Sequence, residues 1–106
     1  MTLNYLKDQI SDELNGARGY IEKAIEAKIS KPMWSRIFVS MADAEAEHAA
    51  NLMNIMESFI REMKKNETRA DSSLTVSNGS PEDIYKNCMK EFGETMTYVN
   101  NMKRGL

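Results

Sequence analysis

The stretch Met41-Ala-Asp-Ala-Glu-Ala-Glu-His-Ala49 places a glutamate and a histidine within an otherwise apolar helical stripe. Glu45 and His48 stand at positions i and i+3, which are neighbours on one face of a helix. The stripe continues on both sides in alternating steps of three and four residues, a spacing typical of packed helix pairs. It consists of Trp34, Phe38, Met41, Glu45, His48, Leu52, Ile55 and Phe59, and the apolar face is broadened by Ile37, Ala42, Ala49, Met53, Met56 and Ile60. The spacing predicts a long helix over about 32–65, with Glu45 and His48 on its packing face.

A second helix with the same period is predicted upstream, from about Leu3 to Ile29. Its stripe is also broken once, by Glu13, and consists of Leu3, Leu6, Ile10, Glu13, Ala17, Tyr20, Ala24 and Ala27. Pro32 separates the two helices, because proline disfavours helix at the residue before it and suits the first turn of the next helix. We therefore expect an antiparallel hairpin that reverses at Ser30-Lys31.

Folding the two stripes together about this turn brings the polar residues into adjacent layers. A charge on a buried seam is costly unless something pairs with it. Carboxylates combined with imidazole suit iron, manganese or zinc better than calcium or magnesium, so a metal site is the sharpest hypothesis. The alternative is a charged seam that only sets the register of the pair. The expected facing pairs are Glu13 with His48, Ala17 with Glu45, Tyr20 with Met41, Ala24 with Phe38, and Ala27 with Trp34.

The C-terminal part of the chain predicts a linker and a third helix. Residues 66–80 are mostly polar, and Ser80-Pro81-Glu82-Asp83 reads as a helix N-cap followed by proline and acids in the first turn. The apolar side of the helix predicted over 81–103 is Tyr85, Met89, Phe92, Met96, Val99 and Met102. The expected organisation is a hairpin over 1–65, a linker over 66–80 and a C-terminal helix over 81–106.

Composition narrows the classes of function. The chain has 106 residues, is 28% charged and carries a formal net charge of −2. It offers no basic face for nucleic acid and no apolar run near the roughly 20 residues that a membrane span needs. Cys88 is the single cysteine, which excludes a cysteine-based zinc or rubredoxin-type site. With no secretory segment at the N-terminus, we expect a cytoplasmic protein, or one enclosed in a cytoplasmic compartment, that is not secreted.

The two helices resemble the ligand-bearing helices of the ferritin-like superfamily, in particular those of rubrerythrins and encapsulated ferritins. In rubrerythrin-like first helices, a metal-binding Glu precedes an Ala by four residues and a Tyr by seven, as Glu13 precedes Ala17 and Tyr20. The second helix of the family carries Glu-x-x-His-Ala after an apolar residue and an alanine. The matching residues are Phe38, Ala42, Glu45, His48 and Ala49, and the resemblance covers about residues 6 to 60.

This resemblance implies a di-iron protein in which Glu13, Glu45 and His48 are both metal ligands and catalytic residues. A complete bundle of the superfamily takes a Glu from each of two helices and a Glu-x-x-His from each of the other two. This chain has one such set and one histidine. We therefore expect an all-α fold, a long hairpin plus a third helix, whose four-helix core is completed by dimerisation. Two iron ions would lie at the two-fold interface, with manganese or zinc as alternatives.

Several functions remain open under this resemblance. The first is a ferroxidase that oxidises Fe(II), in a homodimer or higher homo-oligomer. The second is a helical structural or interaction protein that has the hairpin without turnover, and the third is a peroxide-reducing di-iron protein. The third would need an external electron donor, and iron storage would need a higher assembly or an enclosing shell. Tyr20 is either a residue of the second shell around the metal or an amphipathic core residue.

Overall fold

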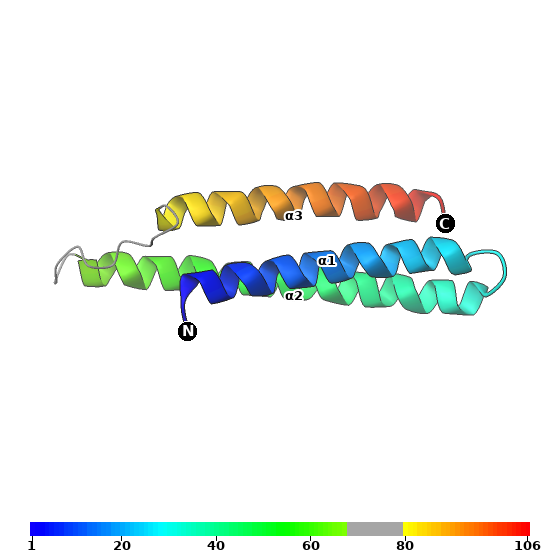
Figure 1. Cartoon of the computed structure of the whole chain (residues 1–106), viewed down its shortest axis with the longest axis horizontal. Helices are drawn as coiled ribbons and strands as arrows, with labels where there is room; N and C mark the ends of the chain where they lie inside the picture. Colours follow the sequence, from blue (N-terminus) through cyan, green and yellow to red (C-terminus); the bar gives the residue numbers. More distant parts are fainter. Residues whose placement is uncertain (68–79) are drawn as a thin grey trace.

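Three helices make up the described part of the computed structural model, which comprises residues 1–67 and 80–106. They are α1 (Leu3–Ala27), α2 (Pro32–Glu67) and α3 (Pro81–Arg104). Helices α1 and α2 form an antiparallel hairpin, and α3 lies along one side of it with the C-terminus near the turn (Figure 1). The molecule is elongated, with extents of 60 × 18 × 17 Å. The predicted all-α hairpin with a third helix is confirmed.

The helix ends follow from local chemistry. The hydroxyl of Thr2 accepts a hydrogen bond from the Tyr5 N–H at 3.1 Å and caps α1. At α3, the Ser80 hydroxyl accepts from the Asp83 N–H at 3.2 Å, and Pro81 occupies the first turn, as predicted. Helix α1 ends slightly earlier than expected and α2 slightly later. Most of the predicted linker, residues 68–79, lies outside the described residues.

The buried stripe of α2 is displaced by one residue from the predicted central stripe, onto residues that include Ala42, Ala49, Met56 and Ile60 of the predicted broader apolar face. The most buried residues of α2 are Ser35, Ala42, Ala46, Ala49, Met56 and Ile60. In contrast, the predicted packing residues Trp34, Met41 and Ile55 are 54%, 37% and 46% exposed, so their predicted burial is wrong. Helix α2 packs against both α1 and α3. Its smaller side chains lie on the face that contacts these two helices. The flank of α2 that carries Trp34, Met41 and Ile55 is left uncovered.

Helix α3 also buries a set of residues that differs from the predicted one. Val99 is fully buried as expected, whereas Met89 is 51% exposed. The buried residues of α3 are Ile84, Cys88, Thr95 and Val99. The predicted side of α3 is therefore only partly correct, because the helix contacts the hairpin with a face that also includes small and polar residues.

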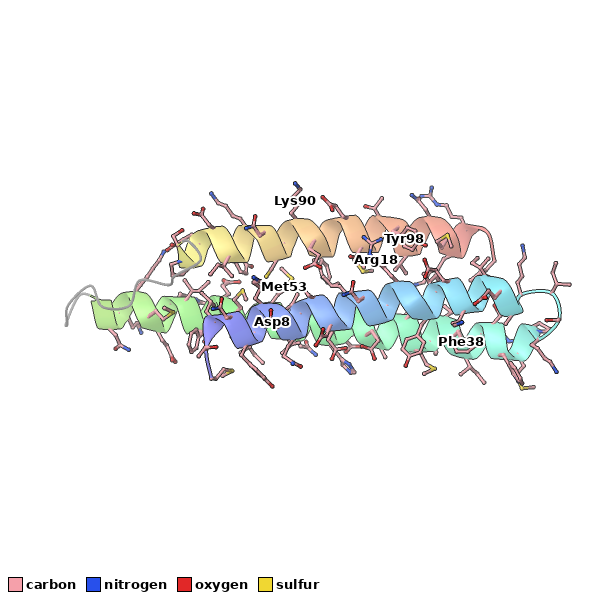
Figure 2. All side chains as sticks on the ribbon, viewed as in Figure 1. Asp8, Arg18, Phe38, Met53, Lys90 and Tyr98 are labelled. Atoms are coloured by element: carbon pink, nitrogen blue, oxygen red, sulfur yellow. The ribbon has the colours of Figure 1, made fainter. Side chains whose placement is uncertain are left out.

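Polar contacts attach α3 to α1. The Arg18 Nε donates to the hydroxyl of buried Thr95 at 3.3 Å, and the Arg18 guanidinium lies 4.8 Å from the ring centroid of Tyr98. Tyr98 in turn donates its hydroxyl to Glu22 at 2.6 Å. Figure 2 shows Arg18 and Tyr98 between α1 and α3, whereas Phe38 lies on the side of the hairpin away from α3. These contacts fix α3 to one side of the hairpin.

The core consists of two apolar clusters along the rod. One contains Leu6, Ile10 and Leu14 of α1 together with Met56 and Cys88, and the other contains Ala17, Ile21, Ala42 and Val99. Glu13 lies in α1 at the level where the two clusters meet. Within the described ranges, no helix is long and apolar enough to cross a bilayer.

Candidate metal centre

Glu13 of α1 meets Glu45 and His48 of α2 on the hairpin. Each of the three side chains offers one ligand atom, and these atoms all lie within 4.8 Å of one another. The predicted pairing of Glu13 with His48 is found: His48 Nδ1 lies 3.4 Å from Glu13 Oε2. The structure thus brings together all three residues that the sequence singled out.

Packing near the turn sets the register that brings these residues together. The Ser35 hydroxyl, on a buried residue, donates to the carbonyl of Ala24 at 2.7 Å, and Tyr20 stacks on Phe38 with ring centroids 6.3 Å apart. The sequence predicts that Phe38 faces Ala24 and that Tyr20 faces Met41. Phe38 packs against the cluster that contains Ala24 and also stacks on Tyr20, while Ser35 reaches the Ala24 carbonyl from the preceding turn of α2. The register at Glu13 and His48 agrees with the prediction.

The two carboxyl groups of the centre interact unfavourably when both are charged. The pKa of Glu45 is raised by its hydrogen bond with Glu13, by burial and by the negative charge of Glu13. The neighbouring His48 acts in the opposite direction and lowers it. A cation bound between the carboxylates would remove this repulsion.

One oxygen atom, Oε2 of Glu13, indicates whether these three residues fit a bound metal ion. Glu13 Oε2 is buried, and no hydrogen-bond donor within the described ranges satisfies it; the 3.4 Å approach of His48 is an ion-pair distance without hydrogen-bond geometry. A buried carboxylate oxygen without a partner is destabilising, and a bound cation would satisfy it. Two carboxylates and one imidazole are a donor set suited to iron, manganese or zinc. The residues present therefore fit a metal of this class.

The centre opens toward the uncovered side of the hairpin. The His48 side chain is 57% exposed, whereas that of Glu13 is 24% exposed. A metal ion could thus reach the ligands from solvent. The same exposure leaves room for ligands that this chain does not supply.

Tyr20 lies near Glu13 in the sequence, but its side chain contacts Phe38. It is half-buried and stacks on Phe38, and its hydroxyl has no hydrogen-bond partner in the part of the chain that the structure describes. Its suggested role in the second shell around the metal stays a prediction. A residue that the sequence analysis did not single out, Gly16, lies directly against the Glu45 carboxylate. The sequence signal that could have identified Gly16 is its position one turn after Glu13 on the same helix.

Comparison with known proteins supports the resemblance seen in the hairpin. The family model described as Rubrerythrin matches residues 4–104, which includes α3 as well as the hairpin. Searches of curated proteins and of solved structures give no match. Because the family model spans nearly the whole chain, this protein belongs to the rubrerythrin family of the ferritin-like superfamily, a family of di-iron proteins.

Proposed function

We propose that this protein is a di-iron oxidoreductase that binds Fe(II) with Glu13, Glu45 and His48 and uses it to reduce dioxygen. The observation that carries the proposal is the convergence of these three side chains around a buried, unpartnered oxygen of Glu13. Membership of the rubrerythrin family supports iron as the metal.

One chain supplies half of the ligands that a di-iron centre of this superfamily uses. Two copies related by a two-fold axis would together supply two each of Glu13, Glu45 and His48. In this arrangement Glu13, Glu45 and His48 of both copies would together hold the two metal ions. We therefore propose that the active form is a homodimer with one centre shared between its subunits.

An exposed stripe on α2 supports a second copy as the partner. We call it the open stripe; it runs through Trp34, Ile37, Met41, Ala44, His48 and Ile55, all of them exposed. Its residues follow in steps of three, four or seven, the spacing of a helix-packing seam, and His48 lies within it. The stripe extends about equally far on either side of Glu45. A two-fold axis near Glu45 would place Trp34 opposite Ile55 of the second copy and would bring the two Glu45 residues together.

Bound iron would supply electron-transfer chemistry, in which the two electrons from two Fe(II) ions, together with two protons, convert dioxygen to hydrogen peroxide. The chain's own residues hold the ions and balance their charge. The pKa of Glu45 is raised beside Glu13, so its ionised form is disfavoured there, and a cation held between the two carboxylates would favour that form. The apolar clusters on either side of Glu13 keep bulk water from the inner side of the centre.

The test is anaerobic Fe(II) binding measured together with sedimentation. We expect one iron per chain, bound in dimers or larger assemblies, and oxidation of the bound Fe(II) when dioxygen is added. A protein that takes up no Fe(II) would support the structural or interaction role instead. Faster oxidation with hydrogen peroxide than with dioxygen would favour the peroxide-reducing alternative.

His48→Ala is the decisive variant. Because His48 is the only imidazole in the chain and its side chain is mostly exposed, its loss should abolish Fe(II) binding and leave the helical content unchanged. Glu47→Gln, an exposed position next to His48, serves as the control and should bind iron normally. Fe(II) oxidation that survives His48→Ala would show that the centre is misassigned.

A further inference from the structure

We infer that Gly16 is a positioning residue of the metal centre, because it leaves the space that the Glu45 carboxylate occupies. A Cβ atom at position 16 would lie 3.0 Å from Glu45 Oε2, 3.2 Å from its Cδ and 3.4 Å from its Cγ. All three nearest atoms belong to one side chain, so Glu45 fills the space beside the Gly16 backbone. The inference rests on the proposed function of Glu45 and extends it to a residue that has no ligand atom.

The backbone at Gly16 does not itself require glycine. Gly16 lies inside α1 and does not adopt the left-handed conformation for which glycine is favoured. Glycine inside a helix is unfavourable relative to alanine. What distinguishes this position is the contact that a methyl group would make with Glu45.

That contact involves the end of a side chain and not a backbone. The Glu45 carboxylate would have to give way by a few tenths of an ångström to accept a methyl group at position 16. A helix hairpin tolerates such a shift, whereas a metal site depends on ligands held within about 0.5 Å of their productive positions. The consequence of a larger residue at position 16 should therefore appear in metal binding rather than in folding.

The chain contains a matched control. Gly19 also lies inside α1, one turn after Gly16, and a Cβ atom there would meet nothing within 4 Å. Gly19→Ala therefore reproduces the change in helix propensity without the contact with Glu45.

The experiment is an anaerobic titration of the full chain with Co(II), followed by visible absorption, which reports the ligand geometry. Gly16→Ala should weaken Co(II) binding by about tenfold or more, the size of effect found when groups that orient ligands are changed, and should shift the absorption bands. Gly19→Ala should leave both unchanged. Wild-type affinity and an unchanged spectrum in Gly16→Ala would overturn the inference, whereas absence of Co(II) binding in all three proteins would overturn the proposed function as well.

Thermal unfolding of the metal-free proteins gives a second readout at one fixed protein concentration. Gly19→Ala should raise Tm by roughly 4 °C, and Gly16→Ala should raise it less because the carboxylate must move. In a Glu45→Ala background the contact is absent, so Gly16→Ala should raise Tm as much as Gly19→Ala does. Equal effects of Gly16→Ala in both backgrounds, or a failure to fold in both, would show that position 16 does not act through Glu45.

Discussion

At the scale of single residues, Glu45 is a carboxyl group whose ionised form is disfavoured in the metal-free protein and which would serve as a metal ligand in the proposed active form. Its pKa is raised, first by the hydrogen bond with Glu13. The folded protein therefore holds the Glu45 proton more tightly than the unfolded chain. The stabilisation is fully present below the ordinary pKa of a glutamate and is lost as pH rises through the raised pKa.

Glu45→Gln should accordingly raise the Tm of the metal-free protein at pH 7, because glutamine cannot ionise beside Glu13. The gain over the wild type should shrink as pH falls below the ordinary pKa of glutamate, and metal binding should be lost. Glu47→Gln removes an exposed carboxylate two positions away and should leave the pH dependence of Tm as in the wild type. A lower Tm for Glu45→Gln at pH 7 would contradict the proposed repulsion between Glu13 and Glu45.

At the scale of helices, the register of the hairpin depends on a polar contact that apolar periodicity does not show. Ser35 is only 6% exposed, and its hydroxyl donates to the carbonyl of Ala24 in the last turns of α1. Carbonyl groups near a helix C-terminus need partners from outside the helix. Ser35 therefore joins the start of α2 to the end of α1, in the register that brings Glu13 beside His48.

Ser35→Ala should lower the free energy of unfolding by about 1 kcal/mol, the net contribution of a typical hydrogen bond, and Tm by roughly 4–8 °C. Thermal denaturation followed by circular dichroism measures the change. Ser40→Ala is the control, since Ser40 lies on the same helix and is exposed. Similar Tm values for the two variants would argue against a role of Ser35 in holding the register.

At the scale of the whole molecule, α2 carries one buried stripe and one exposed stripe. The buried one lies against α1 and α3, whereas the open stripe faces away from the described part of the chain. Helix α3 covers one side of a 60 Å rod and leaves the other side uncovered (Figure 1). The proposed dimer would cover this side and complete the metal centre in one step.

Ile37→Glu tests this arrangement. Placing a charge on the open stripe should weaken the dimer by about tenfold or more, since an apolar side chain is lost and a carboxylate would be buried. Sedimentation should show monomers with unchanged helical content and impaired Fe(II) binding. Met89→Glu on α3 is the matched control, because Met89 and Ile37 are 51% and 53% exposed. A stable dimer of Ile37→Glu would place the interface elsewhere.

Local signals in the sequence are enough to predict the three helices, the hairpin and the convergence of Glu13, Glu45 and His48. Helix periodicity and capping are local properties, and the short turn before Pro32 permits only a narrow range of registers. Those signals are sufficient to predict that Glu45 and His48 of one helix lie near Glu13 of its neighbour.

Only the tertiary structure decided which flank of α2 is buried and what Gly16 contacts. Adjacent stripes on α2 have nearly the same apolar spacing, so periodicity alone could not choose between them. The position of α3 determines which stripe of α2 is buried, because α3 covers Ala42 and Ala49 and leaves Trp34 and Met41 exposed. The space beside Gly16 likewise exists only after α1 and α2 have packed, because it is defined by a side chain of the other helix.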